Sequence, residues 1–110
     1  MKILDTEIEF DFLDAKQVEK FEEEAKKVKE KCKNSKVKKL SLSEALKEEC
    51  KIVDDFFDNM FGKGTSQKIF KGKMNLREHI KAFEDIVNEK IKSQEDLQRT
   101  FEKYMPRRKK

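Results

Sequence analysis

Residues 41–61 decide the fold, and they read SLSEALKEECKIVDDFFDNMF. Ser41 and Glu44 have the spacing of a capping box, the reciprocal pair of hydrogen bonds that starts many helices. Apolar side chains then recur every three or four residues, as in a helix with one buried face. They are Leu42, Ala45, Leu46, Ile52, Val53, Phe56, Phe57, Met60 and Phe61. The stretch therefore predicts a helix over 42–61 that forms the centre of the core.

A second helix is predicted before this one. Asp14 is a residue type that caps helices, and Gln17 follows it three positions later. Acidic residues come early in the segment and lysines late, which complements the helix macrodipole. We expect the helix to end at Asn34 or Ser35. Its apolar stripe is narrow and consists of Val18, Phe21, Ala25, Val28 and Cys32.

Glycines divide the chain after Phe61. Gly62 and Gly64 should stop the central helix, because glycine readily adopts the left-handed conformation common at helix C-termini. A short helical turn carrying Ile69 and Phe70 is expected next, and Gly72 should end it.

The third main helix is predicted to start at Asn75, with Glu78 three positions on. Its stripe is Leu76, Ile80, Phe83 and Val87, with Ile86 and Ile91 beside it. Ser93 and Asp96 suggest a further helix start, although the third helix could also run through. A final short stripe, ended by Pro106, consists of Leu97, Phe101 and Tyr104.

The first residues follow a different period. Ile8, Phe10 and Phe12 alternate with acidic residues, which is typical of a strand with one buried face. With Ile3 and Leu4 before it, this pattern predicts a short β-hairpin within residues 1–13. The expected fold is mainly α: three main helices in a small bundle, the hairpin, and a C-terminal helical extension. We expect one domain over 1–105 and a basic tail over 106–110.

Composition limits the function classes. The chain has 110 residues, of which 45% are charged, and its formal net charge is +4. No apolar run approaches the roughly 20 residues that span a bilayer, so we expect no membrane segment. The two cysteines do not suggest a disulfide framework and predict reduced thiols in or near the core. The whole charge excess comes from the last four residues, Arg107, Arg108, Lys109 and Lys110.

Catalytic and metal-binding patterns are incomplete in this sequence. His79 is its only histidine and lies beside an apolar stripe, so we expect a structural or surface role. Gly62-Lys63-Gly64-Thr65 lacks the order and spacing of a phosphate-binding loop. Asp54 and Asp58 could share a metal ion, but a solvated acidic face is the preferred interpretation. We expect no enzymatic activity, no cofactor and no metal.

Two basic segments could touch nucleic-acid phosphates, the stretch from Lys26 to Lys39 and the C-terminal tail. No aromatic residue alternates with these lysines to stack on bases, so a specific nucleic-acid site is not expected. The tail is interpreted as a flexible contact or a solubilising end.

The segment from Ile52 to Phe70 carries a recognisable pattern. A helix ends in "DxxFGxGT" at 58–65, an "IF" turn follows at 69–70, and an "NL…AF" helix at 75–83. Together with "EFDFLDA" at 9–15, this pattern resembles small proteins encoded in the tail gene clusters of bacteriophages and prophages of low-GC Gram-positive bacteria. The resemblance covers about residues 7–90 and not the segment from Ser93 onward.

The resemblance implies a phage tail morphogenesis protein that acts by protein–protein binding. It would be a tail assembly chaperone or a minor tail structural protein, in the host cytoplasm or in the virion. The implied partners are tail proteins such as the tape-measure protein, or further copies of the chain. An alternative is an inhibitor or regulator of a host nucleic-acid-handling or defence system. Candidate contact residues are Phe56, Phe57, Met60, Phe61 and Phe70, although a core position is the preferred interpretation for each.

Overall fold

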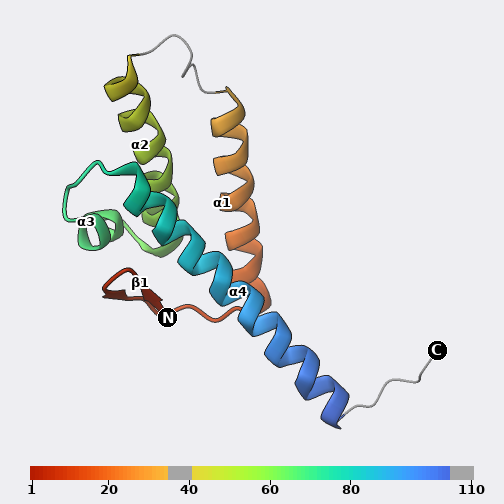
Figure 1. The fold of residues 1–110 in the computed structure, drawn as a ribbon. Coiled ribbons are helices and arrows are strands. Elements are labelled where there is room, and N and C mark those ends of the chain that lie inside the picture. The colour runs from red at the N-terminus through yellow and green to blue at the C-terminus, as the bar shows by residue number, and fades with distance from the viewer. Residues whose placement is uncertain (35–40, 105–110) are drawn as a thin grey trace.

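The computed structural model describes residues 1–34 and 41–104, and within them the chain is mainly helical (Figure 1). An antiparallel hairpin precedes four helices in the described segments, in the order β1, β2, α1, α2, α3, α4. The small, mainly α fold with an N-terminal hairpin is therefore confirmed. The basic tail at 106–110 and the part of the predicted basic stretch at 35–39 lie outside the described residues.

The N-terminal hairpin is shorter than the alternating pattern suggested. Strand β1 (Lys2–Ile3) pairs with β2 (Thr6–Glu7), and the backbone N–H of Ile8 donates to the Met1 carbonyl oxygen at 2.8 Å. Residues 8–12 are not paired as a strand. Ile8 and Phe12 are nevertheless buried, because this segment packs on the hydrophobic core. The alternation marked buried positions correctly, but the prediction that it formed a strand was wrong.

Helix α1 (Ala15–Asn34) starts where the sequence predicted. The Asp14 carboxylate accepts a hydrogen bond from the Gln17 backbone N–H at 3.0 Å, which caps the first turn. The Gln17 side chain accepts from Asp11 N at 3.0 Å and so does not complete a reciprocal box. Phe21 is buried, but Cys32 is exposed. The prediction that Cys32 belongs to the core was wrong, because the stripe of α1 reaches the core only as far as Val28.

Helix α2 (Leu42–Phe61) has the predicted bounds and the predicted capping box. Glu44 N donates to Ser41 Oγ at 3.3 Å, and Ser41 N donates to Glu44 Oε1 at 3.2 Å. α2 contacts α1, α3 and α4, so it is the centre of the fold. Leu42 and Leu46, predicted as core, are exposed. The reason is visible in Figure 1, where the first turns of α2 extend past the start of α4.

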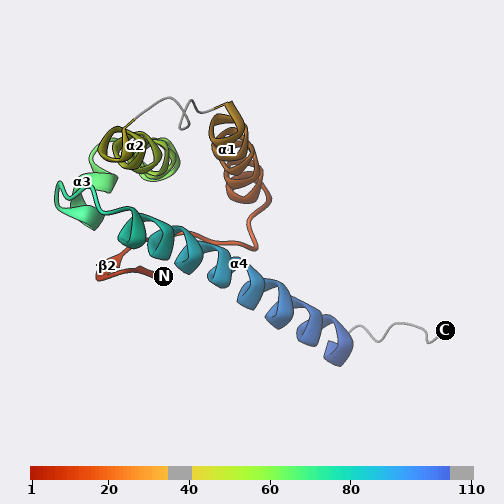
Figure 2. The same cartoon turned by 45° about the horizontal axis from the view of Figure 1, so that its top comes forward.

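Helix α3 (Thr65–Phe70) is the predicted short turn, and α4 (Leu76–Tyr104) is the predicted third helix. Gly64 has φ +95°, a left-handed conformation that lets the chain reverse between α2 and α3. α4 runs without interruption through Ser93 and Asp96, so the C-terminal extension is part of the same helix. Its last turns project beyond the body in both ribbon views (Figures 1 and 2).

Phenylalanine rings fill the core between α1, α2 and α4. The ring of Phe56 lies 6.0 Å from Phe21 of α1 and 5.0 Å from Phe83 of α4, centroid to centroid. Phe57 is fully buried and contacts Phe70 of α3 at 5.9 Å. These mostly edge-to-face contacts bind the helices to α2. None of the helices in the described segments has the length and apolarity needed to cross a bilayer.

Candidate protein-binding surface

An open groove lies where the first half of α2 meets the start of α4. Its volume is about 670 Å³. The apolar lining consists of Leu46 from α2, Met74 from the segment before α4, and Leu76 and Ile80 from the start of α4. Asn75, Arg77, Lys81 and Glu84 supply the polar lining. We call this feature, together with Leu42 one turn before Leu46, the end groove.

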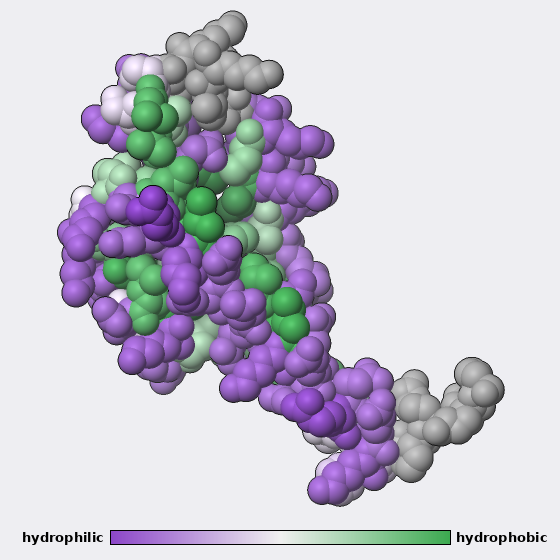
Figure 3. Space-filling model, in the orientation of Figure 1, coloured by the Kyte–Doolittle hydropathy of each residue, from purple (hydrophilic) through white to green (hydrophobic). Residues whose placement is uncertain are grey.

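The apolar side chains of the end groove are unusually exposed. Leu42 is 77% exposed, Ile80 48% and Met74 44%. Figure 3 shows hydrophobic surface over the first turns of α2 and along α4 on one face of the molecule. Clustered exposed apolar side chains with a polar rim are typical of interaction sites, whereas single ones are common on any protein. The end groove is therefore the best candidate for a binding surface.

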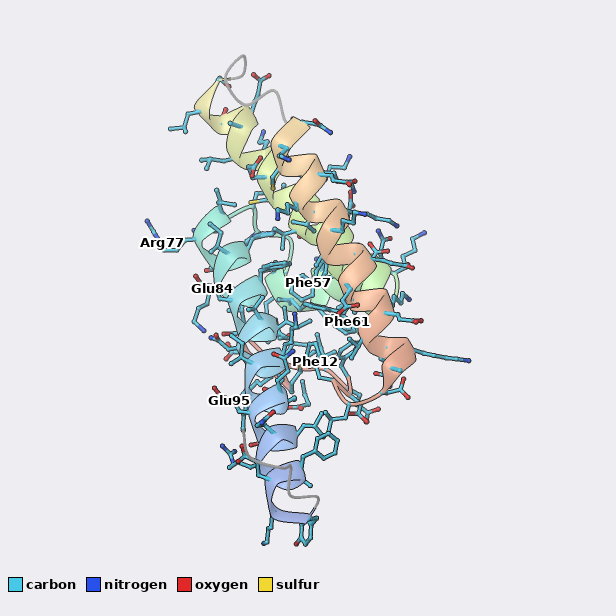
Figure 4. All side chains as sticks on the ribbon, turned by 90° about the vertical axis from the view of Figure 1, so that its right-hand side faces the viewer. Phe12, Phe57, Phe61, Arg77, Glu84 and Glu95 are labelled. Carbon is cyan, nitrogen blue, oxygen red and sulfur yellow. The ribbon has the colours of Figure 1, made fainter. Side chains whose placement is uncertain are left out.

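Basic side chains form the α4 side of the rim. Arg77 and Lys81 are exposed there, beside the acidic Glu84. Lys81 binds Asp85 one turn later, and this hydrogen bond together with the carboxylate charge raises the pKa of Lys81. Figure 4 shows Arg77 and Glu84 on the side of α4 that faces away from α1. The rim would favour a partner with acidic side chains beside its apolar contacts.

A buried histidine connects α4 with α2 and α3. His79 is 0% exposed, and its ring stacks on Phe70 of α3 with centroids 3.7 Å apart. Its Nε2 lies 2.9 Å from Asp54 Oδ1 of α2, and its Nδ1 lies 2.7 Å from the Asn75 carbonyl oxygen. His79 thus joins α2, α3 and α4 inside the fold. The predicted structural role of His79 agrees with this position.

The hydrogen-bond partners of His79 determine which of its ring nitrogens carries a hydrogen. A carbonyl oxygen can only accept, so Nδ1 must carry a hydrogen and donate it to Asn75. One further proton must then lie between Nε2 and the Asp54 carboxyl, because two acceptors cannot bond to each other. Burial raises the pKa of Asp54; the His79 charge and hydrogen bond oppose this, while Asp58 and Asp55 add to it. The imidazole of the pair has no exposed surface, whereas the Asp54 side chain is partly exposed.

Asp54 and Asp58 bind different partners. The Asp58 carboxylate accepts from Ser66 N at 2.8 Å and from Ser66 Oγ at 3.1 Å, at the start of α3. The two carboxylates therefore hold different elements, and the predicted solvated acidic face was wrong for both. In the described segments, no group of three or more His, Cys, Asp or Glu side chains could hold a metal ion.

The structure separates the predicted contact residues. Phe61 is half-buried and lies 5.6 Å from Phe10, centroid to centroid. Figure 4 shows Phe57 and Phe61 between the helices. The other four, which are buried in the core cluster, are Phe56, Phe57, Met60 and Phe70. The five predicted residues therefore do not form one exposed surface.

The cysteines differ in their surroundings. Cys50 is fully buried, whereas Cys32 is exposed with its Sγ 3.7 Å from Glu49 Oε1. Burial raises the pKa of both thiols, and the Glu49 carboxylate raises them further. Asp54 adds to the effect at Cys50. Neither thiol is activated as a nucleophile, because activation requires a lowered pKa.

Comparison with known proteins identifies a family. Residues 4–110 match the family of unknown function DUF6673. The chain belongs to that family. No curated protein matches the chain, and no solved structure does either.

The family match covers more of the chain than the phage resemblance does. It includes the whole of α4 and the basic tail. The projecting turns of α4 are therefore part of what the family shares. The family description assigns no function, and the link to phage tails remains a prediction.

Proposed function

We propose that this protein is a non-enzymatic binding protein of phage tail assembly, a chaperone or a minor tail component. Its end groove holds the apolar face of an amphipathic helix in a tail protein, with the tape-measure protein as the first candidate. Such a protein would act in the host cytoplasm, or in the virion if it is structural. The resemblance of residues 7–90 to tail-cluster proteins supplies the biological setting.

The observation that carries this proposal is the cluster of exposed apolar side chains around the end groove. Leu42, Met74 and Ile80 remain in water while core positions a few residues away are fully buried. Covering this apolar area would be favourable by about 25 cal/mol for each Å² removed from water. A partner that supplies apolar side chains would gain this energy.

The shape and charge of the groove suit a helix. It lies between two helices, and Leu42 and Leu46 are spaced i and i+4, the spacing that packs against ridges of a facing helix. Arg77 on the rim favours an acidic residue beside the apolar stripe of the partner, whereas Lys81 is already paired with Asp85. We therefore expect the occupant to be an amphipathic helix with acidic flanks.

The polar clusters support binding rather than catalysis. Asp54 and His79 form a pair with no exposed imidazole surface. Asp58 is occupied at the start of α3. Both thiols have raised pKa values. Of these groups, the His79 ring and the Cys50 thiol are fully buried and would need rearrangement before they could meet a substrate.

Nucleic-acid binding by an inhibitor or regulator is the alternative, and the described lysines of α1 favour it less. Lys27 pairs with Glu24 at 3.0 Å, and Lys31 lies 3.8 Å from Asp55. Part of the basic charge is thus already neutralised within the fold. Phosphate binding would weaken steeply with added salt, whereas apolar binding in the end groove would not.

The proposal is tested by co-expressing the tagged chain with the tape-measure protein of its own gene cluster. We expect a complex that survives moderate salt. Leu46→Lys should reduce its yield at least tenfold, because a charge in the groove cannot be buried against an apolar helix. The same variant should change the free energy of unfolding by less than about 0.5 kcal/mol, since Leu46 is a surface residue.

The matched control is Leu13→Lys, which places a lysine at another exposed leucine, 56% exposed and outside the groove. It should leave the complex intact. A complex that Leu46→Lys and Leu13→Lys affect equally would contradict the proposed site. The absence of any complex with tape-measure or other tail proteins would contradict the proposed function.

A further inference from the structure

One heptad pattern runs along the whole of α4. Positions spaced alternately by four and three residues are Leu76, Ile80, Phe83, Val87, Lys90, Gln94, Leu97, Phe101 and Tyr104. This is the a/d spacing of a coiled-coil seam. From Ile80 to Tyr104 the pattern is palindromic: three apolar residues, Lys90 and Gln94, then three apolar residues. We call these eight positions the α4 seam.

The α4 seam lies beside the face that α4 buries in the body and overlaps it at Phe83 and Val87, which pack against the core. The buried face carries His79, Ala82 and Ile86, all 0% exposed. The seam residues beside it are only partly covered: Ile80 is 48% exposed, and Phe83 and Val87 are half-buried. Towards the end of the helix, Phe101 and Tyr104 are exposed on the turns that project from the body (Figure 2). The seam therefore continues past the region where the fold covers it.

We propose that a second copy of this chain covers the α4 seam as an antiparallel helix pair. The projecting turns of each copy lie along the first half of α4 in the other. The palindrome then matches Leu97 with Val87, Phe101 with Phe83, and Tyr104 with Ile80, each across the two copies. A helix rises about 1.5 Å per residue, so the paired seam is about 36 Å long.

The polar positions select the antiparallel arrangement. In a parallel, in-register pair, Lys90 would face Lys90 of the second copy, and this like-charge contact is unfavourable. In the antiparallel pair Lys90 faces Gln94, whose amide oxygen can accept a hydrogen bond. Lys90 is already half-buried over the Phe21 ring, 5.7 Å from its centroid.

The positions that flank the seam add no like-charge contacts. Ile91, which is 46% exposed, would meet Ile91 of the second copy beside the central polar layer. Glu84 would lie near Gln98, and Ser93 near Ser93. The charges of the projecting turns lie mostly away from the seam, as Figure 4 shows for Glu95. This arrangement explains why an otherwise charge-rich helix keeps one uncharged side over its last turns.

This inference goes beyond the proposed function and shares only Ile80 and Glu84 with the end groove. The pairing ends at Ile80, which forms one edge of the end groove, and it leaves Leu42 and Leu46 for the tail-protein partner. Leu46→Lys tests the end groove, and Phe101→Lys tests the dimer. The failure of one proposal is thus distinguishable from the failure of the other.

The first test is the mass of the full chain in solution, measured by light scattering at tens of micromolar. We expect twice the 13.1 kDa of a single chain. Phe101→Lys should give single chains with unchanged helical circular dichroism, whereas Glu95→Lys, on the same turns but outside the seam, should remain dimeric. A single-chain mass for the unaltered protein, or a dimeric mass for Phe101→Lys, would overturn the proposal.

The second test fixes the direction of the pair by cross-linking in a Cys32→Ser, Cys50→Ala background. Ile91→Cys lies next to the proposed twofold axis and should form an intermolecular disulfide on mild oxidation. Leu97→Cys alone should not, because it faces Val87 of the other copy. Preferential cross-linking of Leu97→Cys would show a parallel pair and exclude this arrangement.

Discussion

His79 is the residue on which three helices depend. It stacks on Phe70, binds Asp54 across 2.9 Å and holds the Asn75 carbonyl, all without exposed surface. The sequence indicated a structural role for His79 from its apolar neighbours. It could not supply the partner, because Asp54 lies 25 positions earlier and its local pattern suggested only solvated charge.

The Asp54–His79 pair makes stability depend on pH. Burial raises the pKa of Asp54 above its ordinary value of 3.8, so the folded state favours the protonated carboxyl. The contribution of Asp54 to stability is therefore complete below pH 3.8 and is lost as the pH rises through the raised pKa. Cys50, Asp55, Asp58 and His79 are the titratable groups around it.

We predict that Asp54→Asn removes this dependence, because the amide is neutral at every pH and can still bond to His79. The free energy of unfolding of the unaltered protein, relative to that of Asp54→Asn, should fall as the pH rises from about 3 to about 6. Urea unfolding of both proteins at several pH values measures this difference in the free energy of unfolding. Glu95→Gln, on the projecting turns, controls for net charge. A relative stability that rises with pH would show that the carboxylate, not the carboxyl, is favoured.

At the scale of elements, local signals predicted where the helices lie, whereas tertiary packing determined which of their side chains are buried. The capping box at Ser41 and Glu44 located α2 to the residue, because caps are formed by neighbours in sequence. The alternation of Ile8, Phe10 and Phe12 was misleading, since a core can bury alternate side chains of an extended segment without a paired strand. Cys32, Leu42 and Leu46 fitted helical stripes, but α1 and α2 extend beyond the elements that would cover them.

The short helix α3 depends on a cap from outside itself. Asp58 of α2 accepts two hydrogen bonds from Ser66, and no local cap bond satisfies α3 at Gly64. Asp58→Ala should therefore lower the free energy of unfolding by about 1 kcal/mol, as other lost helix caps do. Thermal or urea unfolding measures this loss. Asp55→Ala removes a neighbouring carboxylate whose ion pair, 3.8 Å from Lys31, lies at the surface, and it should cost less; equal losses would count against the capping role.

At the scale of the whole molecule, the fold leaves two apolar surfaces exposed, the end groove and the α4 seam. The sequence alone did not distinguish their residues from core residues. The end groove was missed because its leucines and Ile80 have the same spacing as buried positions. What distinguishes them is where α2 and α4 cross, a long-range feature that a single sequence does not contain. The predicted contact residues were chosen because aromatic and methionine side chains are common at binding surfaces. The structure buries four of them in the core instead, namely Phe56, Phe57, Met60 and Phe70.

Hydrogen exchange of the chain, alone and with its co-purified tail protein, tests the binding account most directly. We predict slower exchange in the complex at residues 42–49 and 74–84, which flank the end groove, and unchanged exchange over residues 15–34 of α1. Protection confined to α1 or to the C-terminal tail, with the end groove unchanged, would contradict the account.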